Sequence, residues 1–183
     1  MQAEEVRGAF IHEQIHSIDE LIDLYSDDLL RLIFSYVHNK ATAEDLLQEV
    51  FVKCYKQISS FRGEANIKTW LYRIAVNQCK DYLKSWHVRK VMLHEKWNQF
   101  VHKSRENELE KTVLQLTEKE VLANVVMTLP MKYREIIYLF FYEDYSITEI
   151  SEIISVNPNT VKTRLKRGKE LVKLEYERRN RDE

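Results

Sequence analysis

A stretch near the C-terminal end, residues 146–174, limits most strongly what this chain can fold into. Ser146 and Glu149 form a capping box at the start of a first helix, in which isoleucines recur at helical spacing. Asn157 can cap a second helix, with Pro158 at its first position, where the missing N–H costs nothing. The sequence therefore predicts two helices joined by a tight turn.

The second helix of this hairpin is strongly basic. Between residues 160 and 173, six basic residues accompany a single acid, Glu170. One face is apolar or small, and it consists of Val161, Leu165, Gly168 and Val172. A short helix, a tight turn and a basic second helix are typical of a helix-turn-helix that places its second helix in the major groove of DNA. The alternative is an ordinary helical hairpin with a solvated basic face.

The rest of the chain favours helices as well. Three glycines and two prolines among 183 residues are too few for a turn-rich β protein. We expect an all-α fold of two small helical domains joined by a linker. The predicted division is a tail (1–16), an N-terminal domain (17–90), a linker (91–116) and a C-terminal domain (117–183).

Charge is segregated along the chain, although the formal net charge is only −1. Residues 1–50 hold three bases and eleven acids, a net of −8, whereas residues 51–90 hold nine bases and two acids, a net of +7. An acidic block beside a basic block favours two different partners, with nucleic acid as the candidate for the basic one.

Nothing in the sequence predicts export or membrane insertion. The first ten residues are acidic and lack the layout of a signal peptide. The longest apolar run, residues 136–142, is far too short to span a bilayer. Cys54 and Cys79 form no metal-spaced pair and are expected to be buried thiols in a reducing cytoplasm. We therefore expect a cytoplasmic protein.

One motif near the N-terminus suggests a different function, zinc-dependent catalysis. His12, Glu13 and His16 match the H-E-x-x-H pattern, in which two histidines one helical turn apart bind zinc and the glutamate acts as a general base. The alternative is a chance match in an amphipathic tail, which is favoured because no scaffold precedes the motif. We expect no catalytic residue, metal or cofactor.

Two helices are predicted in the acidic part of the chain. The first covers residues 17–39, and its apolar stripe consists of Leu21, Leu24, Tyr25, Leu29, Leu32, Ile33 and Tyr36. Thr42 is expected to cap the second, whose inward residues are Leu47, Val50, Phe51, Cys54 and Ile58. Its outer faces carry Glu44, Asp45, Gln48, Glu49 and Val52. These faces either meet only solvent or dock a basic or amphipathic partner.

Asn66 can cap the next helix, which is basic and rich in aromatic residues. Its predicted core stripe is Leu71, Ile74, Ala75 and Tyr82, and its basic surface is Lys68, Arg73, Lys80, Lys84, Arg89 and Lys90. Trp70, Tyr72, Tyr82 and Trp86 interleave rings with these charges. Such a surface suits single-stranded nucleic acid, because cations follow the phosphates and rings stack on unpaired bases. The alternative is that most of the rings are core, and we favour this for Trp70.

The C-terminal domain gains two more helices before the hairpin. The first ends at Pro130 and the second covers residues 131–142, with apolar residues at helical spacing in both. Together with the hairpin they make a four-helix domain of roughly 65 residues, near the lower size at which domains fold alone.

Two long stretches match one family in its order and spacing. The first is ATAEDLLQEVFVKCYKQISSFRGEANIKTWLYRIAVNQCKDYLKS, residues 41–85, and the second is LPMKYREIIYLFFYEDYSITEISEIISVNPNTVKTRLKRGKEL, residues 129–171. The chain resembles the extracytoplasmic-function sigma factors, the short group of bacterial transcription initiation factors in the sigma-70 family. With the flanking helices, the resemblance covers most of residues 20–175.

The resemblance implies three sets of site residues and no enzymatic activity. A polymerase-docking helix, in place of the solvent-facing alternative, would use Asp45, Gln48, Glu49 and Val52. A reader of the melted −10 promoter element would use Phe61, Arg62, Asn66, Lys68, Arg73 and Asn77. A reader of the −35 element as duplex would use Asn159, Thr160, Lys162, Thr163, Arg164, Lys166 and Arg167. The implied partners are core RNA polymerase, promoter DNA and an anti-sigma factor.

The hairpin departs from the family pattern at two positions. Ser151 and Gly168 stand where alanine is usual in the family. Because glycine within a helix costs roughly 0.5–1 kcal/mol relative to alanine, the sequence predicts a softer second helix.

Overall fold

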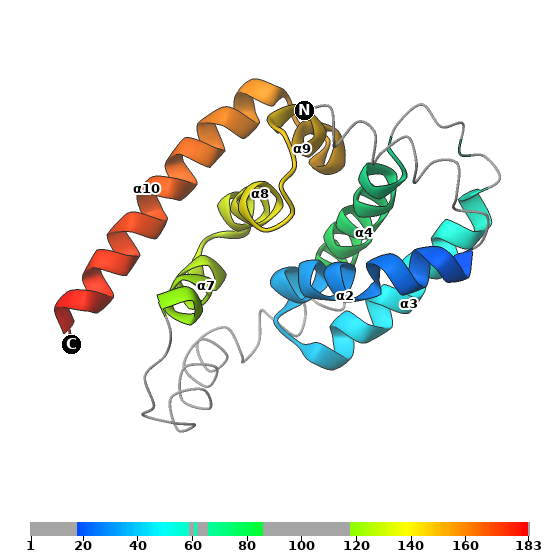
Figure 1. Ribbon diagram of the computed structural model, residues 1–183, viewed down its shortest axis with the longest axis horizontal. Coiled ribbons are helices and arrows are strands. Elements are labelled where there is room, and N and C mark those ends of the chain that lie inside the picture. The colour runs from blue at the N-terminus through cyan, green and yellow to red at the C-terminus, as the bar shows by residue number, and fades with distance from the viewer. Residues whose placement is uncertain (1–17, 59–60, 62–65, 86–117, 183) are drawn as a thin grey trace.

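The computed structural model describes residues 18–58, 61, 66–85 and 118–182, and within these ranges all regular structure is helical (Figure 1). Three helices form the N-terminal domain: α2 (Ile18–Val37), α3 (Lys40–Gln57) and α4 (Ile67–Lys84). Four form the C-terminal domain: α7 (Glu118–Thr128), α8 (Met131–Phe141), α9 (Ile147–Ile154) and α10 (Pro158–Asp182). The predicted all-α fold is confirmed.

Helix α2 buries the predicted stripe with one exception. Leu21, Leu29, Leu32 and Ile33 are fully buried, whereas the Leu24 side chain is 58% exposed. At 100° per residue, position 24 is rotated well away from the centre of this stripe. The prediction for Leu24 is therefore wrong.

Helix α3 begins earlier than the capping pattern suggested. Asn39, in extended backbone, is the N-cap, and its side-chain oxygen accepts a hydrogen bond from the Thr42 N–H at 2.9 Å. Thr42 thus lies inside the helix, and its prediction as the cap is wrong. Leu46, which was not among the predicted inward residues, is buried because it shares one face with Val50 and Cys54. The predicted Leu47 is partly buried and packs against the core.

Helix α4 begins where predicted, since the Asn66 side chain accepts a hydrogen bond from the Lys68 N–H at 2.8 Å. Trp70 is half-buried and packs against Phe61, with ring centroids 5.2 Å apart, as the core alternative requires. Tyr72 is one of the rings that the sequence left open between a nucleic-acid surface and the core, and it is fully buried. The reason is tertiary: Tyr145 of the C-terminal domain lies edge-on against it at 5.2 Å.

The C-terminal hairpin has the helix caps and the turn that the sequence predicts. Ser146 and Glu149 form both hydrogen bonds of the capping box. Ser155 ends α9 in the left-handed conformation, with φ of 57°, and Asn157 accepts from the Asn159 N–H at 2.8 Å to cap α10. These contacts fix the angle at which α10 leaves the turn.

The two domains pack directly on each other within the described part of the chain. Helix α9 lies against α4, and α8 lies against α2 (Figure 1). Buried side chains of both domains join in one continuous apolar cluster. The two surfaces predicted to meet DNA therefore belong to one body.

Both cysteines are free and buried, as predicted. Burial raises the pKa of the Cys54 and Cys79 thiols to about 12, so neither is a reactive thiolate near neutral pH. Among the helices that the structure describes, none combines the length and the apolar character needed to cross a membrane.

A histidine at the end of α2 predicts a measurable pH dependence. His38 has φ of 53°, and burial, aided by the nearby Arg134 cation, lowers its pKa to about 4 from an ordinary 6.5. Because protonation then favours the unfolded chain, the stabilisation is full above pH 6.5 and is lost as the pH falls towards 4. We expect this loss to be about 1–2 kcal/mol, less than the whole shift implies, because the ring is partly exposed.

Thermal unfolding of wild type and His38→Asn between pH 7 and 4 isolates this contribution. Asparagine tolerates left-handed backbone, so the variant removes the titration without straining the turn. The variant should lose less stability over the acid range. Equal slopes for the two proteins would contradict the assignment.

Candidate nucleic-acid interface and docking face

The first turns of α10 present polar and basic side chains to solvent. Lys162 and Lys166 are one turn apart and both exposed, as are Asn159, Thr163 and Arg167. Val161 and Leu165 point the other way into the core. The helix is therefore amphipathic with a cationic outer face, which is what contact with DNA phosphates requires.

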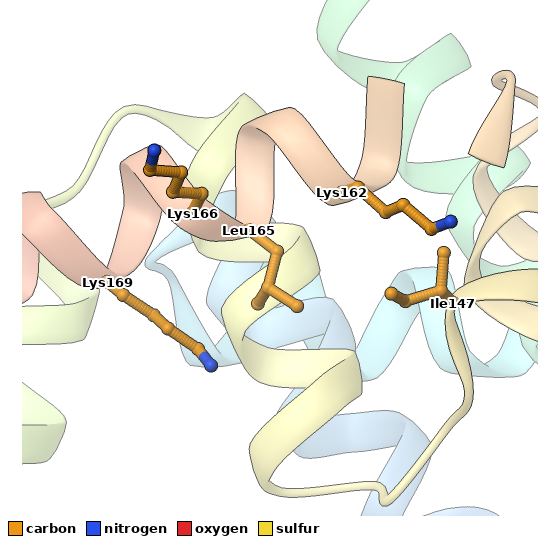
Figure 2. A pocket seen from close by; sticks show the side chains of 5 residues that line it. All are labelled: Ile147, Lys162, Leu165, Lys166 and Lys169. Atoms are coloured by element: carbon orange, nitrogen blue, oxygen red, sulfur yellow. The ribbon is translucent and has the colours of Figure 1, made fainter. Parts of the chain in front are cut away.

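A hollow of about 270 Å³ separates this face from the start of α9. Ile147 and Leu165 give it an apolar lining, and Lys162, Lys166 and Lys169 complete it. Figure 2 shows Lys162 extending beside Ile147, whereas Lys166 and Lys169 point to opposite sides of α10. The lysine heads are thus spread along the helix.

Two arginines of the predicted −35 set form ion pairs within the protein. Arg164 is half-buried, with its Nη1 3.7 Å from Glu135 Oε1 on α8. Arg167 forms a surface pair with Glu170 at 2.8 Å. The Thr163 hydroxyl donates to the Asn159 carbonyl at 2.9 Å. Among the cations of the predicted −35 set, Lys162 and Lys166 are the two with no carboxylate partner within 4 Å in the described structure.

The predicted −10 residues on α4 divide into two groups. Asn66, Arg73 and Asn77 are exposed and lie along one face at helical spacing. Lys68 lies on a neighbouring face, where its Nζ is 3.4 Å from Glu143 and packs over the rings of Tyr72 and Tyr145. Phe61 is half-buried against Trp70, and Arg62 falls outside the described residues.

Helix α3 presents the predicted docking residues together on its outer surface. Asp45, Gln48 and Glu49 are exposed, and Val52 is 52% exposed. The Glu49 carboxylate also accepts a hydrogen bond from the Gln78 side chain of α4, which fixes its orientation. Tyr55, 68% exposed and three residues after Val52, extends this face and was missed. Its helical spacing was the signal that could have found it.

Two glutamates at the domain contact were not predicted at all. Glu135, whose side chain is 4% exposed, accepts from the Tyr36 hydroxyl at 2.8 Å and lies 3.3 Å from Lys80. Glu143, 6% exposed, accepts from the Tyr72 hydroxyl at 2.5 Å. Burial, reinforced by these carboxylates, raises the pKa of Tyr36 and of Tyr72, so both phenols stay protonated donors.

The possible zinc motif at His12, Glu13 and His16 lies outside the described residues. Within the ranges that the structure covers, no cluster of three or more histidine, cysteine or acidic side chains is arranged to hold a metal ion.

Comparison with protein families gives two matches along the chain. Sigma-70 region 2 matches residues 21–87, and Sigma-70 region 4 matches residues 119–172. Sigma factor SigV of Bacillus subtilis is 35% identical over 151 residues, which cover 82% of this chain and 86% of SigV. The extracytoplasmic-function factor SigM of the same organism is 30% identical over 167 residues, covering 91% of this chain and 99% of SigM.

Solved structures share the fold. RpoE of Bartonella quintana, in complex with the anti-sigma factor NepR, superposes with a TM-score of 0.59 at 19% identity, covering 84% of this chain and 92% of RpoE. CnrH, in complex with the cytosolic domain of CnrY, superposes with a TM-score of 0.59 at 18% identity, covering 86% of this chain and 85% of CnrH. The chain therefore belongs to the extracytoplasmic-function sigma factors of the sigma-70 family, which direct RNA polymerase to promoters and are not enzymes.

Proposed function

We propose that this sigma factor reads the −35 promoter element as duplex through α9–α10 and the −10 element as a melted strand through α4 and the preceding loop. The proposed division is residues 17–90 for docking and −10 reading, 91–116 as linker and 117–183 for −35 reading. One observation carries the proposal: the chain exposes two separate DNA-suited surfaces and one acidic docking surface, on three different helices.

The −35 assignment is supported by the exposure of Lys162 and Lys166 on a capped helix. Phosphate contacts set the register of such a helix in the groove, and a few base contacts supply specificity. The full proposed set is Asn159, Thr160, Lys162, Thr163, Arg164, Lys166 and Arg167.

The −10 assignment is supported by the exposed face of α4, where Arg73 and Asn77 combine charge with an amide one turn away. An unpaired base can be bound by amide hydrogen bonds and ring stacking, which repay a few kcal/mol of unstacking. Asn66 and Lys68 complete the described set, and Phe61 lies at its edge. Arg62 is proposed from the sequence alone.

Two protein partners follow from the same assignment. The face formed by Asp45, Gln48, Glu49 and Val52 would dock on core RNA polymerase, with the acids selecting a basic partner surface and Val52 an apolar one. We also propose an anti-sigma factor as a regulator, because RpoE, which shares this fold, was solved with the anti-sigma factor NepR.

Transcription by purified components tests the proposal. Core polymerase with this chain should start RNA at promoters that core polymerase alone ignores, located by mapping start sites after overproduction. A chain that only binds DNA would give no such RNA, and this outcome would reject the proposal.

Charge reversal on α3 should separate docking from DNA reading. Asp45→Lys is expected to weaken binding to core polymerase by roughly 10-fold or more, because it places like charge against a basic partner. Asp23→Lys on the exposed side of α2 makes the same charge change and should leave affinity within about 2-fold. Binding is measured by anisotropy of labelled chain. Equal losses for both variants would remove the docking assignment.

A further inference from the structure

One buried amide lies between the proposed docking helix α3 and its neighbour α4, which pack directly on each other (Figure 1). Gln78, on α4, is 9% exposed, and its Nε2 donates a hydrogen bond to the Glu49 carboxylate of α3. Its Oε1 accepts a hydrogen bond from the ammonium group of Lys53, one turn further along α3. Both ends of the amide are therefore paired, as the burial of a polar group requires.

The two partners allow this amide a single orientation. The Lys53 ammonium group can only donate hydrogen bonds, whereas an ionised carboxylate can only accept them. Turning the amide over would place its NH2 group against the ammonium and its oxygen against the carboxylate. Lys53 therefore holds the NH2 group of Gln78 toward Glu49.

The contact orients the Glu49 carboxylate and leaves it able to bind a partner. An ionised carboxylate has about four lone-pair sites on its two oxygens, and the Gln78 donor takes one of them, on Oε2. Glu49 itself is exposed on the outer surface of α3, beside Gln48 and Val52. A long acidic side chain on this face is thus ordered before any partner arrives.

We propose that Gln78 is a positioning residue for polymerase docking, which holds the Glu49 carboxylate in the direction in which it meets core RNA polymerase. The inference rests on the proposed function, because it takes α3 as the docking helix. Immobilising a long side chain on binding weakens affinity by about 2- to 10-fold, and a side chain that is already ordered avoids most of this loss. Because Gln78 is buried, it acts on the partner through Glu49.

An apolar residue at position 78 should preserve the fold while removing the positioning contact. Methionine is close to glutamine in length and volume and leaves no buried polar atom unpaired. The two groups that lose their partner can be hydrated, since Glu49 is exposed and Lys53 is partly exposed. Gln78→Met is therefore the variant of choice.

The test is a double-mutant cycle on binding of the full chain to core RNA polymerase, measured by anisotropy of labelled chain. Gln78→Met should weaken binding by about 2- to 10-fold in the wild-type background and leave it unchanged in the Glu49→Ala background. A residue that acted only by supporting the fold would weaken binding equally in both. Equal losses, or no loss in the wild-type background, would overturn the proposal.

The matched control is Val76→Ala, which removes apolar volume from a fully buried position on the same helix and removes no hydrogen bond. It should lower the unfolding temperature at least as much as Gln78→Met does, while leaving affinity within about 2-fold. If Val76→Ala weakened binding as much as Gln78→Met, affinity would follow stability, and the positioning role would be rejected.

A second variant serves if Gln78→Met fails to fold. Gln78→Glu keeps the length of the side chain and can still accept from Lys53, but it repels the Glu49 carboxylate instead of donating to it. It should weaken binding in the wild-type background, and this loss should vanish in Glu49→Ala. A loss that persists in Glu49→Ala would count against the proposal.

Nuclear magnetic resonance tests the contact in the free chain, without polymerase. The side-chain NH2 protons of Gln78 should exchange faster with water in Glu49→Ala than in the wild type, and at the wild-type rate in Asp45→Lys, one turn away on the same face. Unchanged exchange in Glu49→Ala would show that the carboxylate and the amide do not interact, and the proposal would fall.

Binding of Asp45→Lys separates this inference from the docking assignment. If Asp45→Lys weakens polymerase binding but the cycle shows no coupling between Gln78 and Glu49, α3 remains the docking helix and Gln78 loses its positioning role. If Asp45→Lys and Glu49→Ala both bind as the wild type does, the docking assignment itself fails, and the inference fails with it.

Discussion

Replacing Gly168 with leucine should destabilise the C-terminal domain by about 3 kcal/mol, the largest effect on folding expected here. Gly168 is buried on the inner face of α10, and even a Cβ atom there would lie 3.0 Å from Ile137 Cγ1 of α8. A leucine side chain must therefore push α10 away from α8. In a domain of this size, we expect thermal unfolding to begin at least about 10 °C lower.

The alanine variant tests the same contact more finely. Gly168→Ala gains roughly 0.5–1 kcal/mol of helix propensity but crowds Ile137, so its net effect should be close to zero. Ile137→Val removes the Cδ1 atom, which would lie 3.2 Å from the new Cβ. In a double-mutant cycle, Gly168→Ala should therefore be more favourable in the Ile137→Val background than in the wild type. Additive effects, or a leucine variant as stable as wild type, would contradict the close-packing account.

This contact gives Gly168 a packing role that the sequence did not predict. The glycine removes a side chain at the place where α10 crosses α8, so that the helices approach closely. Helix propensity is lost, but the approach fixes the angle between α10 and α8. A sequence pattern cannot reveal this, because Ile137 belongs to a different helix and its position depends on the turns between the two.

Local signals predicted the elements well, and their failures have a common cause. Ser146, Asn66 and Asn157 were identified as caps because each acts on N–H groups two or three residues away. Asn39 was missed because Thr42, also a good cap, competed for the same role. Where two capping residues lie within one turn, the sequence gives no basis for choosing.

The exposure of the proposed site residues was predictable where it follows from helical periodicity alone. The outer positions of α3 and α10 follow from the 3.6-residue repeat, and the structure exposes them except for Thr160 and Arg164, which are half-buried. The burial of Tyr72 and Glu135 was not predictable in this way, because their hydrogen-bond partners lie 71 and 99 residues away in the sequence. What was missed is therefore mainly the relation between the two domains.

Removing Lys162 and Lys166 together should have the largest effect on DNA binding. Both are exposed, and neither has a carboxylate within 4 Å among the described residues, so each is available to a phosphate. We expect the double alanine variant to bind the −35 duplex roughly 10- to 100-fold more weakly near physiological salt, at about 1 kcal/mol or slightly more per lost contact. The slope of log affinity against log salt should fall by about 2.

Single variants then distinguish base contacts from phosphate contacts. If Lys166 reads a base, Lys166→Ala should weaken binding to the promoter duplex by about 1–3 kcal/mol and binding to a scrambled duplex much less. If Lys166 contacts a phosphate, binding to both duplexes should weaken equally. Arg167 is paired with Glu170 and must leave it to bind DNA, so Arg167→Ala should cost less than Lys166→Ala. Lys132→Ala on α8 removes the same charge from an exposed site outside the proposed reader. If it matched the double variant in affinity loss and salt slope, binding would reflect net charge alone, and α10 would lose its role as the −35 reader.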